Sequence, residues 1–148
     1  MPELTFQSDD PKSIPGFLIW KTTTLWQREL KSILVEYDVS HAQFVILAAL
    51  LWHQETHQTV LQSALVQFTK MDKMTVSKAL KQLVHKKYIK RSTSEDDTRS
   101  KVVQLRTKGL RLIKTLVPLV EAADKAFFSV LSQRQRNELC KLLSRLSD

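Results

Sequence analysis

The side chains best suited to a chemical task lie in the segment KMTVSKALKQ, residues 73–82, where lysines and hydroxyls recur. Val76, Leu80 and Leu83 follow one another at steps of four and three, so a helix here would turn them inward. The opposite face would then present Lys73, Met74, Thr75, Ser77, Lys78, Lys81 and Gln82. Ammonium groups and hydroxyls are the groups that contact phosphates and base edges in protein–DNA complexes. The segment therefore predicts a helix that binds a polyanion.

A charged hairpin is expected directly after this helix. Residues 88–93 and 101–105 read as two short strands, joined by the polar segment SEDDTRS. Arg99 lies near the tip of this hairpin, and a guanidinium there would be attracted by the negative potential of a narrow minor groove. Lys101 begins the second strand and is expected to contact phosphate.

The positive charge of the chain is concentrated in the same region. The formal net charge is +8, from 23 basic and 15 acidic side chains. Residues 70–115 hold fourteen Lys and Arg against four Asp and Glu, a balance of +10, and the rest of the chain sums to −2. A lysine-rich face that contacts only solvent is the alternative interpretation. The concentration beside the helix of residues 73–82 favours a polyanionic partner.

Catalytic motifs are missing from the sequence. It has no phosphate-binding loop, nucleophile elbow, paired-carboxylate motif or strong metal motif, so we expect no enzyme, metal or cofactor. His53 and His57 invite a metal interpretation, but they fall in HQETHQ, which reads as a loop, and solvated histidines are favoured. Cys140 is the only cysteine, so no disulfide forms within the chain, and we expect a half-buried structural thiol instead of a redox sensor.

The elements that position these residues are expected to be mostly helical, because two glycines and four prolines are too few for a β-sandwich or barrel. Apolar periodicity predicts helices over 14–37, 41–52, 59–68, 73–87 and 107–131, and a last helix after Ser132. Capping signals are expected at Ser40 with Gln43, Thr59 with Gln62, Asp72, and Ser132 with Gln135. Pro118 is expected to kink or weaken the long helix.

These elements divide the chain into a polar tail, residues 1–13, a helix over 14–38, a compact unit over 39–106, and helices over 107–148. The end helices are too apolar for solvent, so we expect them to pack together and against a second copy in a symmetric dimer. Trp20, Trp26 and Trp52 are expected in core or interface packing, with an aromatic ligand pocket as the alternative. No stretch approaches 18 uninterrupted apolar residues and the first residues lack a signal-peptide pattern, so a cytoplasmic protein is expected, with no membrane partner.

Residues 59–105 read as a helix-turn-helix followed by a wing. The run MTVSKALKQLVHKKYIKRSTSEDDTRSKVVQLRTKG resembles the winged-helix core of the MarR (multiple-antibiotic-resistance) transcriptional regulators. The matching positions are Thr75, Val76, Ser77, Leu80, Leu83, Ile89, Arg91, Asp97, Arg99, Leu105, Thr107 and Gly109. The closing LSQRQRNELCKLLSRL resembles the family's last helix, so the resemblance covers about 38–146. Lys87 or Tyr88 replaces the family's glycine, so we expect the recognition helix to end without a left-handed cap.

The resemblance implies a mainly α-helical homodimer with a two- or three-stranded β wing and dimerisation helices at both ends. It implies binding to double-stranded DNA at pseudo-palindromic operators, with residues 73–87 in the major groove and the wing, residues 92–100, in the minor groove. It also implies repression that is relieved by a small aromatic or phenolic effector. The alternative is a winged-helix adaptor whose basic block binds an acidic protein.

Overall fold

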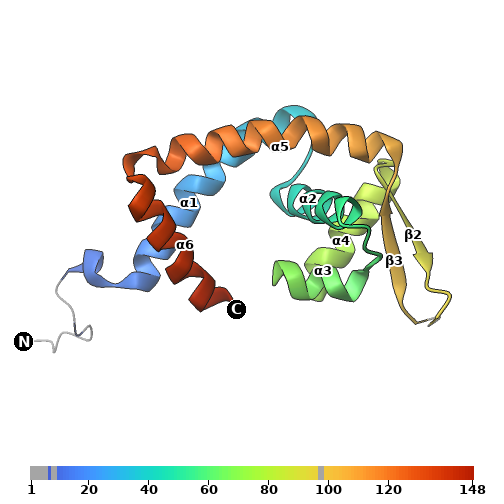
Figure 1. The fold of residues 1–148 in the computed structure, drawn as a ribbon, viewed down its shortest axis with the longest axis horizontal. Coiled ribbons are helices and arrows are strands. Elements are labelled where there is room, and N and C mark those ends of the chain that lie inside the picture. The colour runs from blue at the N-terminus through green and yellow to red at the C-terminus, as the bar shows by residue number, and fades with distance from the viewer. Residues whose placement is uncertain (1–6, 8–9, 97–98) are drawn as a thin grey trace, which may run out of the picture.

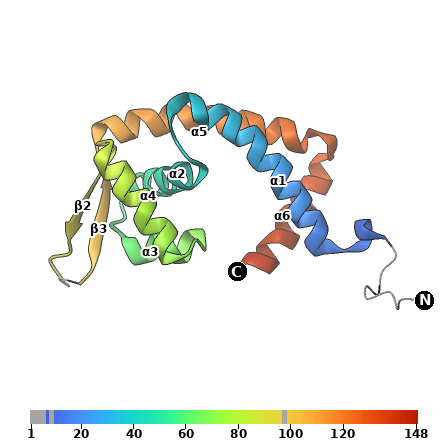
Figure 2. The ribbon, with the colours of Figure 1, turned by 180° about the vertical axis from the view of Figure 1, so that it is seen from behind.

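A long helix, α5 (Thr107–Phe127), spans the molecule and joins two groups of elements into an arch (Figures 1 and 2). The arrangement comes from a computed structural model, which describes residues 7, 10–96 and 99–148. Asp97 and part of the expected wing tip lie outside the described residues. The fold is mainly α-helical with a small three-stranded sheet, which confirms the predicted fold class.

The first group contains the two ends of the chain. It consists of η1 (Pro11–Ser13), α1 (Pro15–Leu34), η2 (Val35–Tyr37), η3 (Phe128–Val130) and α6 (Gln133–Ser147). Helix α1 packs along α5, and the indole Nε1 of Trp26 donates to the Asp124 carboxylate at 2.9 Å. Ser132 and Gln135 form the predicted capping box of α6. Helix α5 continues through Pro118 without interruption and gives way to η3 after Phe127.

The second group surrounds the sheet. It consists of α2 (His41–Glu55), β1 (Val60–Leu61), α3 (Gln62–Thr69), α4 (Lys73–His85), β2 (Ile89–Thr93) and β3 (Lys101–Leu105). The sheet is antiparallel in the order β1-β3-β2, with Val60 opposite Val103 and Ile89 opposite Leu105. Helix α2 carries much of the core, because Ile46 and Leu47 are fully buried, and the capping box of Ser40 and Gln43 that begins it is confirmed.

Two predicted boundaries near the first strand are wrong. Helix α2 runs on to Glu55, so His53 lies in a helix and not in a loop. Thr59 caps no helix, because Val60 and Leu61 pair with β3, and α3 begins at Gln62 without a side-chain cap. Val60 is 4% exposed, so burying it against the sheet outweighs the capping pattern in the sequence.

The predicted absence of a left-handed cap after α4 is also wrong. Lys87 has φ 64°, and its N–H donates to the carbonyl of Val84 at 3.0 Å. The N–H of Tyr88 donates to the carbonyl of Leu83 at 3.0 Å, which completes a Schellman motif. The backbone therefore takes the geometry that usually selects glycine, with a lysine in that position. The helix itself ends at His85, two residues earlier than predicted.

Gly109 allows α5 to begin against the start of β2. A Cβ atom at this position would overlap the carbonyl oxygen of Tyr88 and lie 2.8 Å from its carbonyl carbon. The same carbonyl accepts the N–H of Arg106 at 2.9 Å. The glycine thus fixes the junction between the wing and the long helix.

No single helix in the described ranges is long and apolar enough to cross a membrane. The pair Pro15–Tyr37 and His41–Glu55 has sufficient length and apolar composition together, but it is bent by 80°.

Candidate nucleic-acid interface

Helix α4 is started by a charged cap. Asp72 accepts the backbone N–H of Thr75 at 2.7 Å and the Thr75 hydroxyl at 2.8 Å, as the sequence predicts for an N-cap. These hydrogen bonds, the backbone one first, lower the pKa of the Asp72 carboxyl below its ordinary value. The carboxylate is therefore ionised at neutral pH and holds the first turn of α4 in place.

The outer face of α4 gathers the predicted contact residues. Val76, Leu80 and Leu83 are fully buried and orient the helix. The opposite face exposes Lys73, Met74, Thr75, Lys78 and Lys81, with Ser77 half-buried at its edge. Because the Thr75 hydroxyl already donates to Asp72, it can offer a nucleic acid only its oxygen lone pairs.

Gln82 is exposed, as the sequence predicts for this face, and its side chain also contacts α2. Its side-chain oxygen accepts the amide N–H of Gln43 at 2.7 Å, and Gln43 is 4% exposed. The Gln43 oxygen also accepts from Lys86 Nζ at 3.3 Å, and Lys86 forms an ion pair with Asp38 at 3.4 Å. This contact directs Gln82 toward α2 and ties the second half of α4 to the corner between α1 and α2.

The wing extends from the same side of the molecule. Strands β2 and β3 pair along their whole length, and the Ser94 N–H donates to the Ser100 carbonyl at 2.9 Å to close the hairpin. Arg99, beyond that closure, and Lys101, at the start of β3, are both exposed. The wing tip, α3 and the beginning of α4 project in one direction, away from α5 (Figure 1). The predicted α4 and wing residues therefore lie on one side of the molecule.

Comparison with known proteins decides the family. The winged-helix domain family described as ArnR1-like matches residues 35–122. The HTH-type transcriptional regulator YdcH of Bacillus subtilis (strain 168) is 34% identical over 125 residues, which cover 84% of this chain and 85% of that protein. A MarR transcriptional regulator from Methanosarcina mazei Go1 has a similar solved structure, with a TM-score of 0.74 at 26% identity, covering 88% of this chain and 91% of that one. The chain belongs to the MarR family.

Two solved structures illustrate how widely this MarR-family chain shares its fold. BpsR of Bordetella bronchiseptica has a TM-score of 0.83 at 24% identity, covering 93% of this chain and 95% of that one. A mutant MarR of E. coli in complex with operator DNA has a TM-score of 0.80 at 22% identity, covering 95% and 99%. These two likenesses show the fold. Together with it, the match to the ArnR1-like domain and the likeness to YdcH show that the chain is a DNA-binding winged helix-turn-helix transcriptional regulator of MarR type.

The three tryptophans of this MarR-family chain lie in different surroundings. Trp20 on α1 is 71% exposed, whereas Trp26 is half-buried against His41, with their ring centroids 5.1 Å apart. Burial lowers the pKa of His41 below its ordinary value. Trp52 on α2 is 52% exposed and stacks on Phe68 at 6.2 Å. Their role as ligand-binding residues stays a prediction.

The other residues considered for metal or redox chemistry are dispersed. No three His, Cys, Asp or Glu side chains gather as a metal site in the part of the chain that the structure describes. His53 Nδ1 lies 2.7 Å from the Ala49 carbonyl, within its own helix. Cys140 is exposed on α6, so the expected half-buried position is wrong for the single chain.

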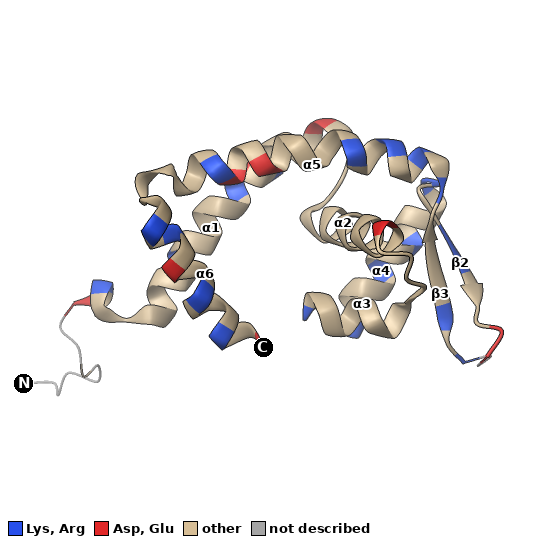
Figure 3. Cartoon of the chain, viewed as in Figure 1, with Lys and Arg blue, Asp and Glu red and all other residues tan. Residues whose placement is uncertain are grey.

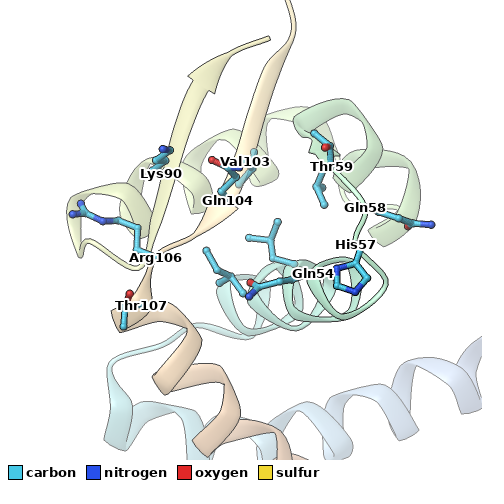
Figure 4. Close-up of a pocket in the computed structure, with 12 residues that line it drawn as sticks. Gln54, His57, Gln58, Thr59, Lys90, Val103, Gln104, Arg106 and Thr107 are labelled. Carbon is cyan, nitrogen blue, oxygen red and sulfur yellow. The ribbon is translucent and has the colours of Figure 1, made fainter. Parts of the chain in front are cut away.

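A cavity of about 670 Å³ lies between the end of α2, strand β3 and the start of α5 (Figure 4). Its apolar floor contains Leu50, Val60 and Val103, which are 3%, 4% and 1% exposed. Lys90 and Arg106 lie at one end, and His57 and Gln58 at the other (Figure 4). The lining contains cations and amides but no carboxylate. Sequence patterns do not reveal this cavity, because its residues come from four separate segments.

Proposed function

We propose that this chain is a homodimeric repressor that binds pseudo-palindromic operators. Residues 39–106 form the DNA-binding unit, and residues 14–38 and 107–148 form the dimerisation helices. Helix α4 enters the major groove, and the wing, residues 92–100, enters the minor groove. The observation that carries the proposal is the exposed α4 face, which lies on the same side of the molecule as the wing tip. A repressor of this kind acts in the cytoplasm, on chromosomal DNA.

The arrangement fits the known geometry of such complexes. In a helix-turn-helix, residues near the N-terminal end of the second helix contact base edges, while basic side chains contact phosphates. Thr75, Ser77 and Lys78 occupy the first two turns of α4 and are assigned to the groove. Lys73, Met74, Lys81 and Lys101 flank it, and Arg99 is assigned to the minor groove. The E. coli MarR structure of similar fold is a complex with operator DNA, which supports this assignment.

Exposed apolar side chains at both ends of the chain support the homodimer. On α1 these are Phe17, Leu18, Ile19, Trp20 and Leu25, and on α6 they are Leu142, Leu143 and Leu146. Trp20 and Leu146 are the most exposed of them, at 71% and 73%. A two-fold contact between copies would remove this surface from water and place two copies of α4 on one duplex.

The cavity of Figure 4 supports relief of repression by a small aromatic or phenolic acid. Its apolar floor suits a ring, and Lys90 and Arg106 suit an anionic group. The BpsR structure of similar fold describes regulation of DNA binding by 6-hydroxynicotinic acid. We expect Arg106→Ala to weaken the response to such an acid and leave operator binding in its absence unchanged. Trp20, Trp26 and Trp52 do not line this cavity, and they remain the alternative ligand residues.

The test is a footprint of the purified protein on the DNA upstream of its own gene. Two protected half-sites about one helical turn apart are expected. A dimer that contacts about ten phosphates should lose roughly a thousandfold or more in affinity between about 50 and 200 mM salt. If the protein protects no DNA but captures an acidic protein, the adaptor alternative is favoured.

Variants then test the groove assignment. Lys78→Ala and Arg99→Ala should each weaken operator binding by roughly tenfold, since one charged contact contributes about 1–3 kcal/mol. Lys31→Ala and Arg28→Ala are matched controls, because both are exposed on α1, outside the DNA-binding unit. Dimer mass and melting temperature should not change in any of the four. Operator binding by Lys78→Ala and Arg99→Ala at the parental affinity would contradict the assignment.

A further inference from the structure

The structure divides the basic block of the sequence into two separate surfaces. Of the fourteen Lys and Arg in residues 70–115, seven lie on α4, in the turn before it, or on the wing between Arg91 and Lys101: Lys70, Lys73, Lys78, Lys81, Arg91, Arg99 and Lys101. The other seven form a second surface, which we call the shoulder: Lys86, Lys87, Lys90, Arg106, Lys108, Arg111 and Lys114. All four acidic residues of the block belong to the first set, which we call the operator side. The shoulder therefore has a net charge of +7 and the operator side a net charge of +3.

Direct contacts join Lys108 to Lys86 and Tyr88, and Lys90 and Arg106 share a cavity. Lys108 Nζ donates to the Lys86 carbonyl at 3.1 Å and lies 4.9 Å from the centre of the Tyr88 ring. Arg111 and Lys114 lie on the next turns of α5, and both are exposed. Figure 3 shows basic positions in blue along this part of α5. Lys86 pairs with Asp38, so the shoulder meets one carboxylate from outside the basic block.

The shoulder lies at the opposite end of the DNA-binding unit from the operator contacts. Lys73 begins α4 and Lys86 follows its last residue, so about 20 Å of helix separates them. Likewise, Lys90 and Arg106 flank the base of the wing, whereas Arg99 and Lys101 lie toward its tip. A duplex seated on the operator side cannot reach the shoulder without a sharp bend, and DNA resists bending over lengths of about 150 base pairs.

The chemistry of the shoulder favours a phosphate backbone over a folded protein. Its exposed side chains are long cations, and protein interfaces usually centre on a desolvated apolar or aromatic cluster. Val84, next to the shoulder in the sequence, is 38% exposed, against 84% for Met74 on the operator side. Phosphates need no apolar anchor, because counterion release from DNA supplies the binding free energy.

We propose that the shoulder binds the backbone of a second DNA duplex, so that the operator-bound dimer bridges two DNA segments. The proposal rests on the proposed function in one respect: the operator must occupy the α4 side. It adds a second, sequence-independent DNA surface on each subunit.

The experiment uses the full-length dimer on beads that carry a short duplex with both operator half-sites. Protein retained on the beads is measured first, so that failure of operator binding is seen separately. A labelled, unrelated duplex of about 60 base pairs is then added, and its capture is measured across a salt series. The same labelled duplex is also titrated with free protein, which tests the shoulder even if the operator fails.

The variant is Arg111→Glu with Lys114→Glu. Its control is Lys21→Glu with Arg28→Glu, a lysine and an arginine about two turns apart on the exposed side of α1. We expect the parent and the control to capture the second duplex. The shoulder variant should bind the operator normally but capture at least tenfold less, with a salt slope shallower by about two because two phosphate contacts are lost.

Three results would overturn the proposal. The parent could capture no second duplex at low salt, or the control could lose capture as fully as the shoulder variant. Third, the shoulder variant could lose binding to the short operator itself, which would place the shoulder on the operator side. Capture of an acidic protein, with no second duplex bound, would assign the shoulder to a protein partner instead.

Discussion

The two glycines of the chain make a matched pair for testing how the wing is joined to the long helix. Both lie in the first turn of a helix, Gly16 in α1 and Gly109 in α5. A Cβ on Gly16 would meet no heavy atom within 4 Å, whereas one on Gly109 would overlap the backbone of Tyr88. The same substitution, glycine to alanine, should therefore have opposite effects at the two sites.

The magnitude follows from the geometry at Gly109. The new methyl would overlap the Tyr88 carbonyl oxygen, its nearest neighbour, and lie 2.8 Å from the carbonyl carbon, so α5 and the residue before β2 must separate to restore an ordinary contact of at least 3.4 Å. Overpacking of this kind costs about 1–3 kcal/mol. Loss of the Arg106 N–H bond to the same carbonyl costs about 1 kcal/mol more. Alanine returns about 1 kcal/mol of helix propensity, so Gly109→Ala should destabilise the fold by about 1–3 kcal/mol.

Gly16→Ala meets no obstruction and should stabilise α1 by up to about 1 kcal/mol. Thermal unfolding followed by circular dichroism, at one fixed protein concentration, is the assay. For a chain of this length, about 3 °C corresponds to 1 kcal/mol, so Tm should fall by about 3–9 °C for Gly109→Ala and rise slightly for Gly16→Ala. If Gly109→Ala is as stable as the parent, the close approach to Tyr88 does not constrain the fold.

Three further predictions concern a helix end, a cap and the ends of the chain. Lys87→Gly should raise the free energy of unfolding by about 0.5–1 kcal/mol, because φ 64° strains a lysine backbone but not a glycine. Lys87→Ala is the control and should give no such gain. Urea unfolding measures both, and an equal gain in the two variants would contradict the strain. The pKa of Asp72 is lowered in the folded chain, so its stabilisation is complete above the ordinary value of 3.8 and is lost as the pH falls through the folded pKa. Asp72→Asn should flatten that part of the acid-unfolding curve, and an unchanged curve would exclude the cap as its source. Trp20→Glu should convert the proposed dimer to a monomer, measured by light scattering. Val35→Glu is the control and should leave the dimer intact, because Val35 is 64% exposed but is not one of the exposed apolar residues of α1 and α6. If Trp20→Glu is still a dimer, the interface lies elsewhere.

Local signals in the sequence predicted most of the elements. The capping boxes at Ser40 and Ser132, the cap at Asp72 and the two long wing strands all depend on residues within a few positions of one another. The same kind of signal failed at Thr59, because Val60 pairs with Val103, 43 positions away. A pairing over that distance leaves no mark in the local pattern, and it decided that the segment is a strand.

At the candidate site, too, local sequence patterns predicted the helix face, whereas contacts between helices could not be predicted. The outward face of α4 follows from the spacing of Val76, Leu80 and Leu83, and the structure confirms that these three side chains are buried. The hydrogen bond between Gln82 and Gln43 could not be predicted, since Gln43 lies on another helix. A count of charged residues along the sequence treats the basic block as one surface. Such a count does not show that α4 and the wing each carry basic residues at both of their ends.

The junction at Gly109 also determines how the two legs of the arch communicate. Helix α5 starts against the backbone of Tyr88 and continues for 21 residues, about 31 Å, to the turn that precedes α6. A rigid rod of that length works as a lever: each degree of tilt at the wing end moves the far end by about 0.5 Å. In the proposed dimer, small rotations at this carbonyl would therefore be amplified into a change in the separation of the two recognition helices, the quantity that must match the spacing of half-sites along the DNA.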